Sequence, residues 1–100
     1  MQHLALLNKV VQHQHLSFEE AGDLIADVVT SGTPAQISSF LTAYAIGGLS
    51  SAELAGFASR LRKDAVQVTS PVTNHIDTCG TGGGISSFNV STAAAIIAAG

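Results

Sequence analysis

Residues 16–66 read LSFEEAGDLIADVVTSGTPAQISSFLTAYAIGGLSSAELAGFASRLRKDAV, and three helix-start signals are spaced along this stretch. Each signal is a Ser or Thr followed three residues later by Glu or Gln, the arrangement of a capping box. The three boxes pair Ser17 with Glu20, Thr33 with Gln36, and Ser50 with Glu53. Pro34 supports the second box because proline suits the first position of a helix. The stretch therefore predicts three consecutive helices.

Apolar residues at helical spacing follow each capping box, and a similar set precedes the first box. The four sets are Leu4, Leu7 and Val11; Phe18, Ala21, Ile25 and Val28; Ile37, Phe40, Leu41 and Tyr44; and Leu54, Phe57, Ala58 and Leu61. Gly32 and the pair Gly47 and Gly48 mark helix ends. We predict four short helices with these residues as their core, forming an amino-terminal helical domain over residues 1–64. Because the connections are short, consecutive helices are expected to pack as neighbours.

The pattern changes after residue 64. Residues 65–74 have no helical period and are expected to form an extended connector, whereas residues 75–79 read as a short strand before a glycine loop and a helix. A strand needs a partner for its backbone groups, and a strand followed by a helix is half of a βαβ unit. We therefore expect an α/β full protein of which this chain is the amino-terminal piece. It supplies an all-α helical domain and, over residues 75–100, the first strand, glycine loop and helix of an α/β domain.

The composition excludes several classes of protein. The chain is 46% hydrophobic and 11% charged with a formal net charge of −3, which argues against disorder and against nucleic-acid binding. Its basic cluster, Arg60, Arg62 and Lys63, suits the carboxyl end of a helix. A single cysteine, Cys79, excludes an intrachain disulfide. The sequence shows no signal-peptide pattern and no apolar run long enough for a membrane span, so we expect a soluble cytoplasmic protein.

Residues 80–84, of sequence GTGGG, lie between the predicted strand and helix. Glycines let a ligand approach the backbone N–H groups closely, and a helix start adds a positive end, so the position suits a phosphate. Hydroxyl and amide side chains follow directly at Ser87, Asn89, Ser91 and Thr92. The loop lacks the lysine of a P-loop and the spacing of a dinucleotide fingerprint. A turn before a capped helix is the alternative interpretation.

Two motifs in this region, DTCGTGG at residues 77–83 and FNVSTAAA at residues 88–95, resemble the anthranilate phosphoribosyltransferase family, and the preceding helical stretch is similar to that family's amino-terminal domain. The resemblance implies transfer of the phosphoribosyl group of phosphoribosyl pyrophosphate (PRPP) to the amine of anthranilate. Pyrophosphate is released, and the reaction belongs to tryptophan biosynthesis. It also implies Mg²⁺ on the phosphates and a homodimer formed through the helical domain. Apolar residues expected at that dimer surface are Leu4, Leu7, Val11, Phe40 and Tyr44.

Carried over by position, the resemblance assigns substrate-binding roles but no catalytic residue. Gly80 and Gly83 would lie in the pyrophosphate loop, with Gly80 also near anthranilate, and Ser91 would reach Mg²⁺. The residues implied for substrate binding are Gly80, Gly83, Gly84, Ser87, Asn89, Val90, Ser91 and Thr92. The chemistry suits these residue types because displacement of a good leaving group depends mainly on positioning and charge stabilisation.

The loop departs from the family pattern at Gly84. The family has an aspartate after GTGG and one more residue before the Phe-Asn pair, so this chain lacks a carboxylate near the phosphates. The family's Lys-His-Gly-Asn-Arg segment, Asp-Glu metal pair and anthranilate-binding arginine come later than residue 100. We therefore expect the 100-residue chain alone to be inactive.

Two other functions fit the sequence. A relative of the pyrimidine nucleoside phosphorylases would hold phosphate on the same loop, although their loop is preceded by a Lys-His-Ser type sequence. The chain would otherwise serve as a non-catalytic helical dimerisation fragment.

Overall fold

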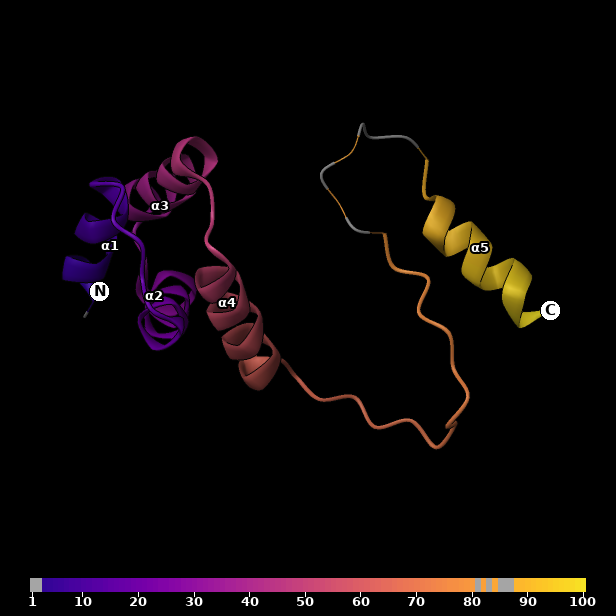
Figure 1. Cartoon of the computed structure of the whole chain (residues 1–100). Helices are drawn as coiled ribbons and strands as arrows, with labels where there is room; N and C mark the ends of the chain where they lie inside the picture. Colours follow the sequence, from indigo (N-terminus) through magenta and orange to yellow (C-terminus); the bar gives the residue numbers. More distant parts are fainter. Residues whose placement is uncertain (1–2, 81, 83, 85–87) are drawn as a thin grey trace. The chain divides into compact units, whose positions relative to one another are not determined.

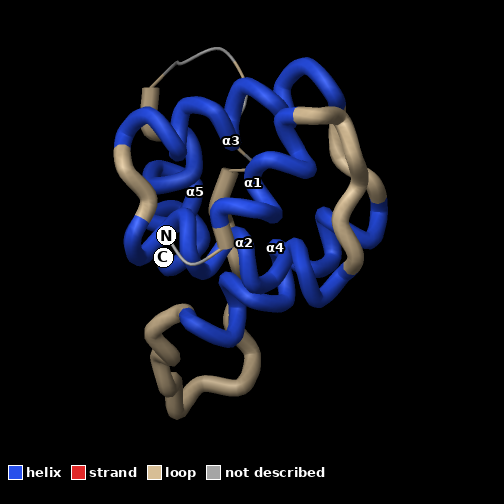
Figure 2. The backbone as a smooth tube through the Cα atoms, turned by 90° about the vertical axis from the view of Figure 1, so that its left-hand side faces the viewer, coloured by secondary structure: helices blue, strands red, loops and turns tan. Residues whose placement is uncertain are grey.

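The computed structural model describes residues 3–80, 82, 84 and 88–100, and these residues form five helices and no strand (Figure 1, Figure 2). The helices are α1 (Leu4–Val11), α2 (Phe18–Ser31), α3 (Pro34–Gly47), α4 (Ser51–Asp64) and α5 (Val90–Ala99). The chain divides into two compact units, Met1–Gln67 and Val68–Gly100. The four helices predicted in the first unit and the helix predicted in the second are confirmed.

All three predicted capping boxes form, and each closes in both directions. The N–H of Glu20 donates to Ser17 Oγ at 3.1 Å, and the Glu20 carboxylate accepts the Ser17 N–H at 3.0 Å. The same pair of bonds measures 3.3 and 2.9 Å between Thr33 and Gln36. Side-chain capping of this kind stabilises a helix by about 1 kcal/mol, so three local signals define where α2, α3 and α4 begin.

The helices pair with their next-but-one neighbours. α2 packs mainly against α4, and α1 packs against α3. The expectation that consecutive helices pack as neighbours holds only in part. α1 contacts α2, and the Phe40 and Tyr44 rings of α3 pack on Phe57 of α4, but the most extensive contacts join non-consecutive helices. The apolar faces and the small residues of each helix therefore determine which helix it packs against. The short connections only limit how far apart consecutive helices can lie.

Two glycines explain the close approach of α2 and α4. A Cβ placed on Gly22 of α2 would lie 3.6 Å from the carbonyl oxygen of Gly56 in α4, an ordinary contact. A Cβ placed on Gly56 would overlap the carbonyl oxygen of Phe18 and lie 3.0 Å from the Ala21 Cβ. Only glycine at position 56 is therefore compatible with this helix crossing.

The hydrophobic core is contiguous but differs in part from the predicted one. Its buried residues are Leu7, Val10, Leu16, Ala21, Leu24, Ile25, Val28, Phe40 and Phe57. Several predicted core residues are exposed instead: Leu4, Val11, Phe18, Ile37, Leu41, Leu54, Ala58 and Leu61. Conversely, Leu7 and Phe40, which were expected at a dimer surface, are only 4% and 6% exposed and belong to the core. The largest error is in α4, whose inward face carries Glu53, Gly56 and Phe57.

The second unit contains α5 and irregular chain. Residues 75–80 have no regular structure, so the strand predicted over residues 75–79 is wrong for this chain. The physical reason is the absence, among the described residues, of a second strand to accept and donate backbone hydrogen bonds. The helix α5 has no buried residue.

We predict opposite effects for the same substitution at the two glycines. Gly56→Ala should destabilise the chain by about 1–3 kcal/mol, since the added methyl group overlaps the backbone of α2. Gly22→Ala is the matched control and should be neutral or stabilising by up to about 1 kcal/mol, because alanine favours a helix. Urea unfolding followed by circular dichroism measures both. Equal effects at the two positions would contradict this account of the crossing.

Candidate functional site

The glycine loop and the start of α5 contain every site residue implied by the sequence. Gly83 and Ser87 lie outside the described residues, whereas Gly80, Gly84 and residues 89–92 are described. A Cβ placed on Gly80 would lie 3.5 Å from Ser91 Oγ, so the loop returns Gly80 to the first turn of α5. Two residues eleven positions apart, each predicted for the same ligand, are thereby neighbours. A Cβ on Gly84 would meet nothing within 4 Å.

The backbone around Gly80 is shaped by local hydrogen bonds and by glycine. The Asp77 carboxylate accepts the N–H of Cys79 at 2.8 Å, and the exposed Cys79 thiol lies 3.4 Å from the Gly80 carbonyl oxygen. Gly82 has φ of +75°, a left-handed conformation that favours glycine. The backbone conformation therefore favours glycine at position 82, and there is open space beside Gly84.

The start of α5 has the chemistry of an anion site. Asn89 is the N-cap residue, but its side chain makes no capping hydrogen bond, so the amide remains available to a ligand. The N–H groups of the first helical turn have no carbonyl partner within the helix. That of Val90 donates instead to the Phe88 carbonyl, before the helix, at 2.7 Å. The remaining N–H donors form the positive end of the helix dipole, and Ser91 and Thr92 add hydroxyl groups to the same turn.

The donor set fits Mg²⁺ only in part. Ser91 offers one hydroxyl oxygen, and among the described residues no three His, Cys, Asp or Glu side chains are grouped to hold a metal ion. Mg²⁺ prefers six oxygen ligands and commonly takes several from substrate phosphates and water. The Ser91 hydroxyl would therefore supply one such ligand, and the other ligands of a Mg²⁺ ion would come from elsewhere.

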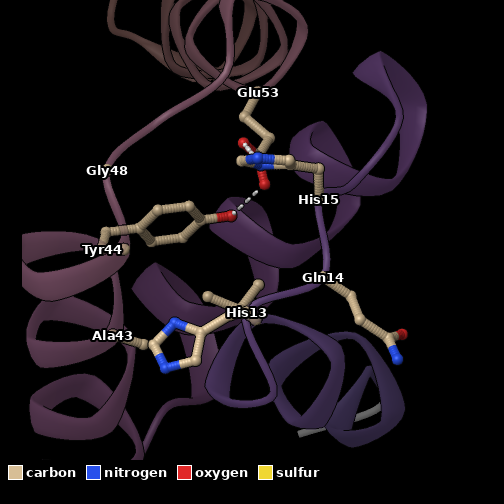
Figure 3. A pocket seen from close by; sticks show the side chains of 9 residues that line it. His13, Gln14, His15, Ala43, Tyr44, Gly48 and Glu53 are labelled. Carbon is tan, nitrogen blue, oxygen red and sulfur yellow. Dashed lines mark hydrogen bonds and ion pairs between the residues drawn. The ribbon is translucent and has the colours of Figure 1, made fainter.

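A second polar cluster lies in the helical bundle around Glu53, which is only 1% exposed (Figure 3). We call His15, Leu16, Tyr44, Ser50 and Glu53 the Glu53 cluster. Oε1 accepts the Leu16 N–H at 3.0 Å and the Tyr44 hydroxyl at 3.1 Å. Oε2 accepts the Ser50 N–H at 2.7 Å and lies 2.9 Å from His15 Nδ1. Since a carboxylate only accepts, the His15 ring carries a proton on Nδ1.

These contacts shift two pKa values. Burial by itself raises the pKa of Glu53, but hydrogen bonds from Leu16, Ser50 and His15 outweigh burial and lower that pKa to about 2. Burial raises the pKa of the Tyr44 hydroxyl, and the neighbouring Glu53 charge raises it further. Glu53 is therefore an ionised, fully bonded carboxylate inside the bundle at neutral pH.

A small cavity of about 50 Å³ adjoins the cluster. Its other walls come from the end of α1 and the turn after it, and from the end of α3 and the residue that follows. They are Val10, His13, Gln14, Ala43, Gly47 and Gly48. The sequence marked Glu53 only as a capping residue. No local spacing showed that Leu16 and Tyr44 would share its carboxylate, and none of the implied substrate-binding residues belongs to the cluster.

The comparisons with known proteins define the class of the chain. Residues 4–65 match the family described as glycosyl transferase family, helical bundle domain, and the chain belongs to that family. No solved structure gives a significant match. None of the described helices combines the length and apolar character needed to cross a bilayer.

The matched relatives are anthranilate phosphoribosyltransferases. Over 94% of its length the chain is 47% identical to 28% of the enzyme of Pelotomaculum thermopropionicum. It is 46% identical, over 96% of its length, to 29% of the enzyme of Moorella thermoacetica. For Methanocorpusculum labreanum the identity is 48% over 94% of the chain and 28% of the enzyme. The resemblance inferred from the motifs is confirmed, and the chain spans less than a third of these relatives.

The lowered pKa of Glu53 predicts a specific loss of stability in acid. A carboxyl whose pKa is about 2 when folded and near 4.5 when unfolded stabilises the fold fully above pH 4.5, and this contribution disappears as the pH falls towards 2. The urea concentration at which half of the helical circular dichroism is lost, measured between pH 7 and pH 2.5, should fall more steeply in the native chain than in Glu53→Gln.

The matched control is Glu19→Gln, which removes an exposed glutamate and leaves the Glu53 cluster intact. It should retain the steep acid dependence. If Glu53→Gln kept the same dependence as the native chain, the assignment of the lowered pKa to Glu53 would be wrong.

Proposed function

We propose that this chain is the amino-terminal part of an anthranilate phosphoribosyltransferase. The enzyme would transfer the phosphoribosyl group of PRPP to the anthranilate amine, giving N-(5-phosphoribosyl)anthranilate and pyrophosphate in cytoplasmic tryptophan biosynthesis. The observation that carries the proposal is the similarity of 94–96% of the chain, which includes the helical bundle and the glycine loop, to relatives of that name.

The residues described here would bind the phosphates of PRPP. The N–H groups at Gly80 and at the start of α5 would donate to phosphate oxygens, and the Ser91 and Thr92 hydroxyls would add further donors. Donors held in place before the reaction stabilise charge as it develops on the leaving pyrophosphate. No general acid or base is assigned within this chain, since the rate would come from positioning two substrates and stabilising that charge.

Mg²⁺ would enter with PRPP, and the Ser91 hydroxyl would supply one of its ligands. When bound, the ion would neutralise phosphate charge. With one protein oxygen offered here and no aspartate after Gly83, the rest of its coordination would come from phosphate, water and residues beyond this chain.

A nucleoside phosphorylase relative is the second candidate, because the matched family is defined by its helical bundle and does not specify the acceptor. Calorimetric titration of a full-length protein that contains this chain separates the two. Binding of PRPP with Mg²⁺ supports the proposal. Binding of phosphate with thymidine, without PRPP binding, would favour the phosphorylase.

The helical bundle also supports a proposal of homodimerisation. Its pair α1 and α3 exposes large apolar side chains, among them Leu4 at 48%, Val11 at 49% and Leu41 at 60%. These residues are available to a second copy, in contrast to Leu7 and Phe40, which the core uses.

We predict that Asn89→Ala raises the KM for PRPP in the full-length enzyme by about tenfold or more, the effect of losing one hydrogen bond to a charged group. The helical circular dichroism should not change, since the Asn89 side chain makes no capping bond. Asn74→Ala, at an exposed asparagine of the connector, is the matched control and should leave KM unchanged. An unaltered KM in Asn89→Ala would remove Asn89 from the site.

We predict that Leu41→Asp weakens dimerisation of the chain at least tenfold, because it places a charge at an exposed apolar position of α3. Thr42→Asp puts the same charge on the adjacent exposed position and should have a smaller effect. Sedimentation at several concentrations measures both dissociation constants. A native chain that stays monomeric at micromolar concentrations would contradict the proposal.

A further inference from the structure

The Glu53 carboxylate joins segments from both helix pairs. Its donors come from the turn between α1 and α2, from the last turns of α3, and from the connection into α4. The bundle itself consists of α1 packed on α3 and α2 packed on α4. One side chain of α4 therefore holds the turn after α1 and the end of α3 at the same time.

The two pairs also meet where α1 contacts α2, with an ion pair of 2.6 Å between Lys9 and Glu20. The aromatic side chains provide a further contact between the pairs, next to the Glu53 cluster. The ring of Phe57 in α4 meets the rings of Phe40 and Tyr44 in α3 edge-on, with centroids 5.6 and 5.4 Å apart. Tyr44 takes part in both contacts, since its ring packs on Phe57 and its hydroxyl donates to Glu53. Movement at Glu53 would therefore be transmitted to the aromatic contact.

The turn held by Glu53 is in a conformation that is unfavourable for its residue type. His13 has φ of +59°, in the left-handed region. A Cβ placed on Gly47 would lie 3.1 Å from His13 Nδ1, so the ring is close against the end of α3. A left-handed conformation of this kind persists when the surrounding structure stabilises it. The bonds that join His15 and Leu16 to the Glu53 carboxylate lie two and three residues after His13 and stabilise the turn.

We propose that Glu53 is a conformational latch between the two helix pairs. Its carboxylate keeps the turn after α1 and the end of α3 closed against α4. Without the carboxylate, the two pairs separate at the Glu53 cluster while the helices persist. The latch thereby makes the bundle unfold as one unit.

The chain carries its own probe of the latch. Tyr44 is the only tyrosine and the sequence has no tryptophan, so intrinsic fluorescence reports the Glu53 cluster alone. Urea unfolding of the 100-residue chain is followed by Tyr44 fluorescence and by far-ultraviolet circular dichroism. In the native chain the two transitions should coincide. In Glu53→Gln the fluorescence transition should come at a clearly lower urea concentration than the loss of helix.

The matched control is Glu20→Gln, which makes the same change in the capping box of α2, also removes the ion pair between Glu20 and Lys9 of α1, and does not touch the Glu53 cluster. Its two transitions should still coincide. Coincident transitions in Glu53→Gln would overturn the proposal, and so would separated transitions in Glu20→Gln.

Amide hydrogen exchange on His15→Ala provides a second test if Glu53→Gln fails to fold, because this variant removes one donor and keeps Tyr44. The amides of Leu16 and Ser50 both donate to Glu53 and should exchange about tenfold faster or more. Exchange at Val28, in the core of α2, should be unchanged. Equal acceleration at all three amides, or no acceleration at Leu16 and Ser50, would overturn the latch.

Discussion

A carboxylate buried in a small helical bundle requires partners for both of its oxygens, and this requirement organises the first unit of the chain. Removing a carboxylate from water costs roughly several kcal/mol unless hydrogen bonds replace the hydration. Each Glu53 oxygen accepts two donors, and the four donors come from three separate segments. Glu53 shares the inward face of α4 with Gly56 and Phe57, whereas Leu54 and Leu61 of the same helix are exposed.

The local part of this fold could be predicted from the sequence, and the non-local part could not. Capping boxes depend on residues three apart, so the sequence alone predicted where α2, α3 and α4 begin. The choice of helix partners depends on which backbones can approach, which Gly56 decides through space. Residues 75–79 have the composition of a strand, but a strand also requires a partner, and the described residues contain none.

The candidate site divides in the same way. The glycine loop and the hydroxyl residues after it could be proposed as a site from the sequence because they lie within one short stretch. The structure adds that Gly80 lies close to Ser91. The Glu53 cluster could not be predicted from the sequence, because Leu16 and Tyr44 are 37 and 9 residues away from Glu53 along the chain. The family match extends over the bundle, whereas the phosphate chemistry proposed for the chain belongs to its last 21 residues, from Gly80 onward.

The most direct measurement of the central constraint is the titration of the Glu53 carboxyl itself. Its ¹³C resonance can be followed by nuclear magnetic resonance in the folded 100-residue chain as the pH is lowered. A buried carboxylate with four donors should titrate with a pKa of about 2. A pKa at or above 4.5, the ordinary value, would show that the four hydrogen bonds do not hold this charge inside the bundle.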